Sequence, residues 1–323
     1  MDERRVALLF PGTGAQYPAM AAGLYGTEPV FTAAVEEVLA AFGGRGDLLR
    51  ADWLEGRPID HVTRSTPLLF AVDYALGRLV LSWGVRPAAL LGHSIGEIVA
   101  ATLAGVFEVA DIARVIAVRA RHLADAPPGS MLAVAAGPDD VAPYLGGDLV
   151  VGAVNAPRQV VLSGPADRLA LARTALRDDG WICRPVPALS PFHSPAMRDV
   201  AARGADLYTT LRPRPPRLPV YSAYLGRLMT AGDATDPGFW IGQPAAPVLF
   251  WPALEALLDG GSYHLVEAGP GDGLTTLARQ HPAVRDGFSV TTALLPFRRK
   301  PGRGDAGTAA LARDRLTALT PAG

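Results

Sequence analysis

Cysteine is almost absent from this sequence, since Cys183 is the only one among 323 residues. A single cysteine cannot form an internal disulfide or supply a multi-thiolate metal site, so both are excluded. The absence of disulfides fits a reducing compartment, and we therefore expect a cytoplasmic protein that holds no metal.

Long apolar runs and an excess of one charge are missing as well. The first five residues lack the basic start and apolar core of a signal peptide, and no apolar run approaches about 18 residues. Thirty basic residues face thirty-one acidic ones, which leaves a formal charge of −1. We therefore expect no export, no membrane association and no nucleic-acid partner.

The overall composition is typical of a folded globular protein. Apolar residues make up 49% and charged residues 19%, which excludes intrinsic disorder. The length fits about two domains. The sequence has no repeat of fixed period, so we do not expect a solenoid or a propeller.

Short apolar strands alternate with helices in the first third of the chain. Val6 to Phe10 is an apolar strand candidate, followed by a glycine-containing turn and a helix. Ser65-Thr66-Pro67 predicts the start of a helix that continues through Trp83. The next strand, 88–91, enters another glycine turn and helix, so we predict an α/β fold with a parallel sheet covered on both faces.

Residues from about 130 to 187 have a different predicted order of strands and helices. Its apolar patterns predict a strand at 131–136, a helix from 138, strands at 149–154 and 159–163, a helix at 165–177 and a strand at 181–186. This is the βαββαβ order of a ferredoxin-like unit. We expect residues 127–194 to form a small inserted subdomain, residues 1–126 and 195–300 to form the large domain, and residues 301–323 to be a loosely attached tail with a final helix near 308–319.

Gly92-His93-Ser94-Ile95-Gly96 matches the G-x-S-x-G elbow that exposes a nucleophilic serine on a tight turn between a strand and a helix. The helix that follows offers backbone amides to a developing oxyanion. An ordinary glycine-rich turn is the alternative, but the strand before it and the apolar helix after it favour Ser94 as a nucleophile.

A serine nucleophile needs a base, and the sequence has six histidines. His193 lies in the loop that leaves the small subdomain, where catalytic groups are common. This position favours His193 as the base but does not exclude the other five histidines, which are His61, His93, His122, His264 and His281.

Five motifs together resemble the malonyl-CoA:acyl-carrier-protein acyltransferases and the acyltransferase domains of polyketide synthases. In order they are 10–16 (FPGTGAQ), 92–97 (GHSIGE), 155–164 (NAPRQVVLSG), 192–195 (FHSP) and 267–270 (EAGP). The resemblance covers nearly the whole chain. It implies an α/β-hydrolase-like large domain with a parallel sheet and an inserted ferredoxin-like subdomain, which agrees with the element order above.

The resemblance also implies roles for individual residues. Ser94 would be the acylated nucleophile and His193 its general base, oriented by a backbone carbonyl that we place near Ala246. The backbone amides of Thr13 and Ile95 would form the oxyanion hole. Arg119 falls where the family pairs a guanidinium with the free carboxylate of malonyl, a geometry that suits its bidentate fork. The remaining substrate-binding positions are Gln16, Thr66, Asn155 and Phe192.

Two positions depart from the family. Thr13 and Thr66 stand where members usually carry glutamine. Because both positions are expected near the acyl group, the resemblance does not determine which acyl group is transferred. Phe192 and Ile95 resemble members that use malonyl, whereas Ser190 and Pro191 do not complete that pattern.

The function implied by the resemblance is transfer of a malonyl or related carboxyacyl group from acyl-CoA, through Ser94, to the phosphopantetheine of an acyl carrier protein in polyketide or fatty-acid biosynthesis, with no bound cofactor. We expect a free-standing, trans-acting monomer, an excised synthase domain being the alternative. Rival functions are transfer of a non-malonyl group between carrier proteins, editing hydrolysis of acyl thioesters, and a silent carrier-binding module. Because carrier proteins are acidic, a basic patch is expected to bind them; its candidates are Arg184, Arg198, Arg298, Arg299 and Lys300.

Overall fold

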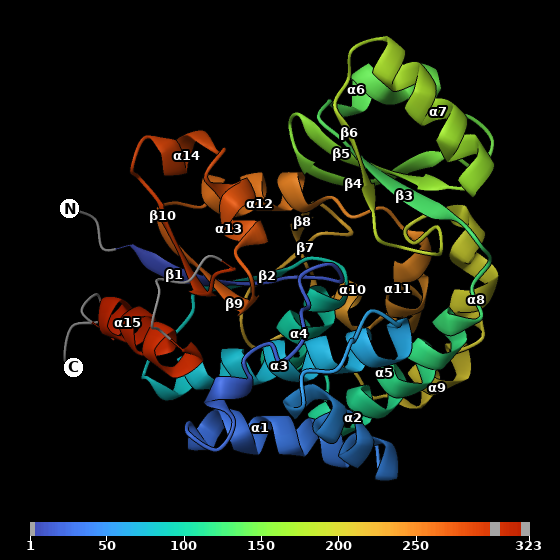
Figure 1. Cartoon of the computed structure of the whole chain (residues 1–323). Helices are drawn as coiled ribbons and strands as arrows, with labels where there is room; N and C mark the ends of the chain where they lie inside the picture. Colours follow the sequence, from blue (N-terminus) through green and yellow to red (C-terminus); the bar gives the residue numbers. More distant parts are fainter. Residues whose placement is uncertain (1–3, 298–303, 318–323) are drawn as a thin grey trace.

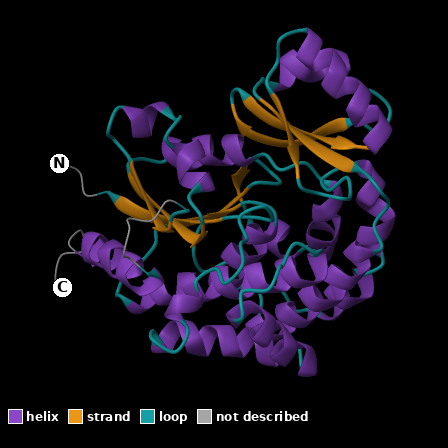
Figure 2. Cartoon of the chain, in the orientation of Figure 1, coloured by secondary structure: helices purple, strands orange, loops and turns teal. Residues whose placement is uncertain are grey.

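The large domain is built on a six-stranded sheet with the order β10-β9-β1-β2-β7-β8 (Figures 1 and 2). The structure is a computed structural model that describes residues 4–297 and 304–317. Five strands run parallel and β8 pairs with β7 in the antiparallel sense. Their bounds are β1 Arg5–Phe10, β2 Ala89–Gly92, β7 Val220–Ser222, β8 Arg227–Leu228, β9 Tyr263–Pro270 and β10 Val290–Leu295.

Helices cover both faces of this sheet, as the continuous apolar strands require. Successive residues of β1 point to opposite faces: Leu8 and Phe10 join the core beneath α1, α3, α4 and α5, whereas Ala7 and Leu9 pack toward α12 and α13. The bounds of these helices are α1 Pro29–Ala40, α3 Val62–Ser82, α4 Ile95–Leu103, α5 Val109–Ala124, α12 Phe250–Asp259 and α13 Gly273–Ala278. The predicted α/β fold with a parallel sheet is confirmed.

Shorter elements complete the large domain. They are η1 Ala22–Leu24, α2 Gly44–Leu54, η3 Pro195–Met197, α8 Arg198–Ala202, α9 Ala205–Thr210, α10 Ala231–Thr235, α11 Pro237–Gly242, η4 Gln243–Ala245 and α14 Pro282–Arg285. Sequence patterns did not predict β8 or β10. β8 has two residues, and β10 carries two polar threonines among its apolar positions, so neither gives a clear apolar strand signal.

The small subdomain is a four-stranded antiparallel sheet with the order β4-β5-β3-β6, seen at the upper right of Figure 1. This is the strand order of the predicted βαββαβ unit. The elements are β3 Ser130–Val134, α6 Pro138–Val141, η2 Ala142–Tyr144, β4 Val150–Ala156, β5 Gln159–Gly164, α7 Ala166–Asp178 and β6 Cys183–Val186. The edge of β4 binds the large domain through two backbone hydrogen bonds, from Val154 N to Val248 O at 2.8 Å and from Val248 N to Gly152 O at 2.9 Å.

The predicted start of α3 at Ser65-Thr66-Pro67 is wrong. The helix begins at Val62, with His61 as its N-cap, and Pro67 lies inside it. Proline lacks the amide that would bond to the carbonyl four residues earlier. Arg45 Nη2 donates to that carbonyl, Thr63 O, at 3.4 Å, so the oxygen left by Pro67 has a partner.

The C-terminal helix α15, Asp305–Thr317, is packed rather than loosely attached. Ala309, Ala312 and Leu316 are buried in the main core, and Asp305 Oδ2 accepts a hydrogen bond from Gly23 N at 2.9 Å. The glycine- and arginine-rich stretch before the helix suggested weak attachment, but the buried small residues give the helix a close-packed face. The carrier-contact candidates Arg298, Arg299 and Lys300 lie outside the described residues.

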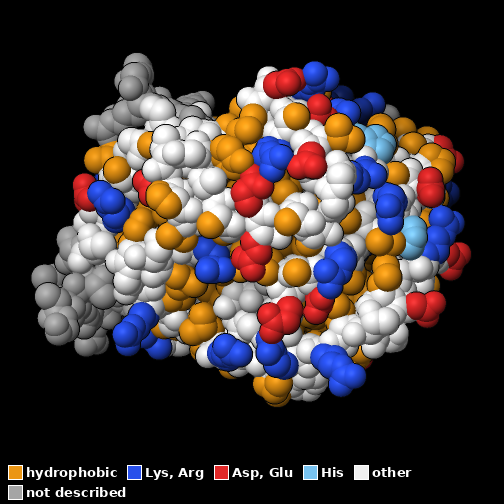
Figure 3. Space-filling view, turned by 90° about the horizontal axis from the view of Figure 1, so that it is seen from below, with side chains coloured by type: hydrophobic (Ala, Val, Ile, Leu, Met, Phe, Trp, Pro, Cys, Tyr) orange, Lys and Arg blue, Asp and Glu red, His pale blue; other side chains and the backbone are white. Residues whose placement is uncertain are grey.

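Basic and acidic side chains are interspersed over the face of the molecule shown in Figure 3. Among residues 4–297 and 304–317, none of the helices is both long and apolar enough to cross a membrane. The same residues contain no group of three or more histidine, cysteine, aspartate or glutamate side chains that could hold a metal ion.

Candidate active site

Ser94 lies on the turn between β2 and α4, in a strained backbone conformation. Its φ is 53° and its ψ −120°, a region that residues with a side chain seldom adopt. The flanking glycines allow this turn: a Cβ at Gly92 would lie 2.1 Å from Gly96 C, and a Cβ at Gly96 would lie 2.2 Å from Phe10 O. The sharp turn therefore depends on both glycines.

His193 forms a hydrogen bond to this serine. Its Nε2 lies 2.9 Å from Ser94 Oγ, and its Nδ1 lies 3.0 Å from the carbonyl oxygen of Ala246. A carbonyl oxygen only accepts hydrogen bonds, so Nδ1 carries the proton and Nε2 is free to accept one from the serine. The expected contact between the histidine and the carbonyl of Ala246 is confirmed.

The small subdomain and the large domain hold His193 from both sides. The residue has a φ of 63°, and its amide donates to Pro244 O at 2.8 Å. From β5, Ser163 Oγ donates to the carbonyl of the preceding residue, Phe192, at 2.6 Å. The loop that carries His193 is therefore held by hydrogen bonds to both the small subdomain and the large domain.

Burial keeps the imidazole of His193 neutral. Its pKa is lowered to about 4, first by removal from water, then by repulsion from the neighbouring His93 ring when that ring is protonated, and by the positive charge of Arg119. His93 is also buried, which lowers its pKa, and its Nε2 bonds to Asn155 Oδ1 at 2.9 Å. A neutral His193 at physiological pH can accept the serine proton.

Backbone amides lie close to the serine. Ile95 is the first residue of α4, so its amide has no partner within the helix. Thr13 belongs to the turn after β1, which passes so near that a Cβ on Gly12 would lie 3.1 Å from Ser94 Cβ. In the same turn Gln16 Oε1 accepts a hydrogen bond from Gly14 N at 2.7 Å, so its side chain supports the turn.

Arg119 extends from α5 toward the same centre and is half-buried. Its Nη1 donates to the hydroxyl of buried Tyr208 at 2.9 Å. In the described part of the chain no carboxylate lies within 4.0 Å of its guanidinium. Its charge nevertheless lowers the pKa of His193, so a cation without a carboxylate partner among the described residues lies near Ser94 and His193.

A family model described as an acyl transferase domain matches residues 7–311. The chain belongs to this acyltransferase family. It is 41% identical over 281 residues to a subunit of the phenolphthiocerol/phthiocerol polyketide synthase of Mycobacterium tuberculosis, an alignment that covers 86% of this chain and 19% of that protein. The chain therefore spans about a fifth of the length of this curated relative.

Solved structures of acyltransferase domains have the same fold. The acyltransferase domain of SpnD, in complex with 2-(pent-4-yn-1-yl)malonyl, matches with a TM-score of 0.90 and 35% identity, over 99% of this chain and 78% of that one. The acyltransferase domain from the second module of the salinomycin polyketide synthase matches with a TM-score of 0.88 and 34% identity, over 96% and 72%.

Two other residues expected at the acyltransferase site, Phe192 and Thr66, pack among neighbouring side chains. Phe192 is half-buried and packs between the two units, and Thr66 is buried within α3. Thr66 forms no hydrogen bond to the side chain of Ser94, His193 or Arg119, and the ring of Phe192 can contribute only apolar contacts. Of the described carrier-contact candidates, Arg184 on β6 and Arg198 at the start of α8 are exposed.

Sequence reasoning missed three residues at this acyltransferase site. Glu97, which follows the elbow, is buried and links α4 to the end of β7 by accepting from Ser222 Oγ at 2.6 Å and Ala223 N at 2.8 Å. Burial raises the pKa of Glu97 to about 8. Tyr208 and Tyr224, the other two, come from segments that carry no motif. Only Glu97 had a signal, because it ends the motif at 92–97 and is a charged residue in an apolar helix.

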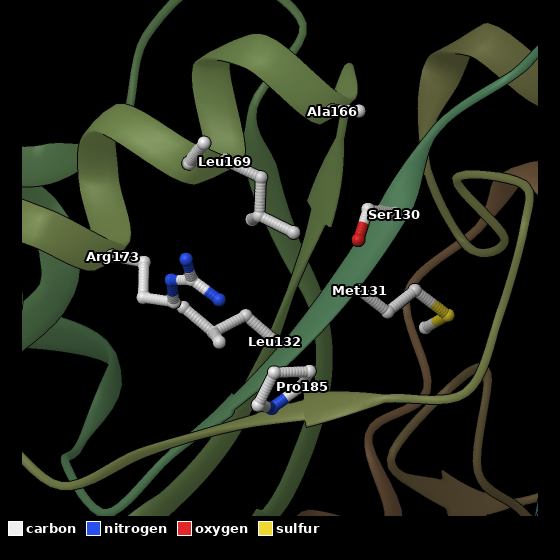
Figure 4. A pocket seen from close by; sticks show the side chains of 8 residues that line it. Ser130, Met131, Leu132, Ala166, Leu169, Arg173 and Pro185 are labelled. Atoms are coloured by element: carbon white, nitrogen blue, oxygen red, sulfur yellow. The ribbon is translucent and has the colours of Figure 1, made fainter.

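A separate hollow of about 130 Å³ lies on the small subdomain between α7 and the sheet (Figure 4). Its lining residues are Ser130, Met131, Leu132, Ala166, Leu169, Ala170, Arg173 and Pro185. None of them is an expected site residue.

Proposed function

We propose that this acyltransferase moves a malonyl-type carboxyacyl group from a CoA thioester to Ser94 and then to the phosphopantetheine thiol of an acyl carrier protein. The observation that carries the proposal is the chain of contacts from Ser94 Oγ to His193 Nε2 at 2.9 Å and from His193 Nδ1 to Ala246 O at 3.0 Å. This arrangement activates a hydroxyl nucleophile without an acidic third residue.

In the first half-reaction, Ser94 Oγ attacks the thioester carbonyl while His193 Nε2 takes the hydroxyl proton. The amides of Ile95 and Thr13 donate to the oxyanion, and the positive end of α4 favours the same charge. As the intermediate collapses, the C–S bond breaks and the protonated His193 returns its proton to the departing thiolate. The second half-reaction runs the same steps with the carrier thiol as the nucleophile.

A carboxyacyl group is proposed because the half-buried guanidinium of Arg119 has no carboxylate partner among the described residues. An incoming carboxylate would supply that partner through charge-assisted hydrogen bonds. The relative from SpnD, whose solved structure is a complex with a substituted malonyl group, supports this choice of acyl class.

Intact-mass measurement of acyl-enzyme tests the proposal. The native chain is incubated with malonyl-, methylmalonyl- and acetyl-CoA, and a carrier protein is then added as a separate chain. We expect a malonyl adduct that is absent in Ser94→Ala, slow to form in His193→Ala, stable in buffer, and transferred to the carrier.

Rapid loss of the adduct to water would instead indicate a hydrolase, and absence of any adduct would contradict the proposal. Transfer to the separate carrier also tests the trans-acting prediction. Cytoplasmic location and a monomeric state stay predictions from the sequence.

A further inference from the structure

Tyr224 belongs to a turn that the acyltransferase motifs do not include but that the catalytic elbow holds in place. Glu97, on the helix that begins at the elbow, accepts the hydrogen bond from Ser222 Oγ. That Ser222 oxygen in turn accepts from the amides of Tyr224 and Leu225, both at 3.1 Å. The backbone of Tyr224 is thus tied to α4 through two consecutive hydrogen bonds.

The ring of Tyr224 forms part of the wall around the catalytic histidine. Its centroid lies 6.1 Å from that of His193, and it packs edge-on against Phe239 at 6.3 Å. Only 9% of the residue is exposed. Two aromatic neighbours and a fixed backbone leave the ring little room to move, so the position of its hydroxyl is well defined.

The hydroxyl of Tyr224 is buried without a hydrogen-bond partner of ordinary geometry in the described ranges. The positive charge of Arg119 and the side chain of Ser94 are both close enough to this hydroxyl to oppose the rise in its pKa. Burial raises the pKa of Tyr224, so at neutral pH the group is a protonated donor. A buried donor without an acceptor is unfavourable, and a ligand that supplies an acceptor removes that cost.

We propose that Tyr224 is a specificity-determining residue whose hydroxyl, together with Arg119, donates a hydrogen bond to the carboxylate of the acyl group on Ser94. The inference rests on the proposed carboxyacyl function. Arg119 is anchored through one nitrogen to Tyr208, which leaves its other donors for the ligand. A carboxylate has two oxygens, so it can accept from the guanidinium and from the Tyr224 hydroxyl at once.

The experiment compares Tyr224→Phe, which removes only the hydroxyl, with the native chain and with Tyr221→Phe. Tyr221 lies three residues earlier on β7, so it is a matched control. Single-turnover acylation of Ser94 is measured with malonyl-CoA and acetyl-CoA. We expect Tyr224→Phe to lower kcat/KM for malonyl about 10- to 100-fold and to change that for acetyl less than about twofold, with both rates unchanged in Tyr221→Phe.

Two further measurements separate recognition from structure. If the two donors share one carboxylate, Tyr224→Phe should lower malonyl acylation much less in an Arg119→Ala background than in the native one. The melting temperature of ligand-free Tyr224→Phe should equal or exceed the native value, because the hydroxyl forms no hydrogen bond of ordinary geometry in the described residues.

If Tyr224→Phe changed kcat/KM equally for malonyl and acetyl, or did not change it, the inference would be wrong. The Tyr224 ring would then contribute only packing around His193. A lower melting temperature would show that the hydroxyl has a structural partner. Failure of the proposed function appears differently, since the native chain itself would then not prefer malonyl over acetyl.

Discussion

Replacing Arg119 by alanine tests the origin of acyl-group selectivity. The guanidinium is half-buried, anchored to Tyr208 and close enough to His193 to lower its pKa. Removing one partner of a buried hydrogen-bonded charge pair costs about 2–5 kcal/mol, and partial exposure places this pair near the lower end, at about 2–3 kcal/mol. Malonyl acylation should therefore fall about 30- to 150-fold.

Acetyl acylation should change little or even rise, because a neutral acyl group never paired with the guanidinium. Rapid-quench acylation of Ser94, measured as kcat/KM for both CoA thioesters, gives the two values. Arg121→Ala is the matched control, since this exposed arginine lies two residues along the same helix. Tyr208→Phe should have a smaller effect, about 3- to 10-fold on malonyl. A parallel fall for malonyl and acetyl would contradict carboxylate recognition by Arg119 and indicate a structural role for this residue.

Three more expectations follow from the geometry, and a fourth from the charges of the surface. Acylation rates measured in stopped-flow should be flat from about pH 6 to 8 and fall with a midpoint near 4, because protonated His193 cannot accept the serine proton; a midpoint near 6.5 would contradict this. Between pH 6.5 and 4 the native chain should lose unfolding free energy relative to His193→Ala in denaturant titrations, because unfolded histidine binds a proton that buried His193 resists, while the opposite contribution of Glu97, whose pKa is raised to about 8, is common to both chains. Gly96→Ala should lower the unfolding free energy by about 3 kcal/mol, because its Cβ would meet Phe10 O, and a native melting curve would argue against the close approach. Arg184→Glu and Arg198→Glu should slow transfer to a carrier protein more than acylation from CoA, and equal salt sensitivity of the two half-reactions would count against a basic docking patch.

Much of the fold was predictable because its strands are short, apolar and bounded by glycine or proline. The alternation of such strands with helices indicated the parallel sheet, and the different order in 130–186 indicated the separate antiparallel sheet. The start of α3 was not predictable in this way. Pro67 is a strong helix-start signal, and the carbonyl that it leaves without an amide partner, Thr63 O, accepts a hydrogen bond from Arg45 on a different helix.

The two residues proposed as nucleophile and base, Ser94 and His193, were predictable to different degrees from the sequence alone. Ser94 lies in a local motif whose glycines have a steric reason, whereas His193 is 99 residues away and only its loop position favoured it. The family resemblance supplied the role of His193 and the place of the orienting carbonyl. Tyr224 could not be found in this way, because its place beside Ser94 depends on Glu97 and Ser222, two residues 125 positions apart in the sequence.

The most direct test of the central claim is the mass of the native chain after brief incubation with malonyl-CoA, followed by peptide mapping. We expect one malonyl group on Ser94 that leaves when a carrier protein with phosphopantetheine is added. A chain that stays unmodified with every acyl-CoA, or that carries the group on another residue, would contradict it.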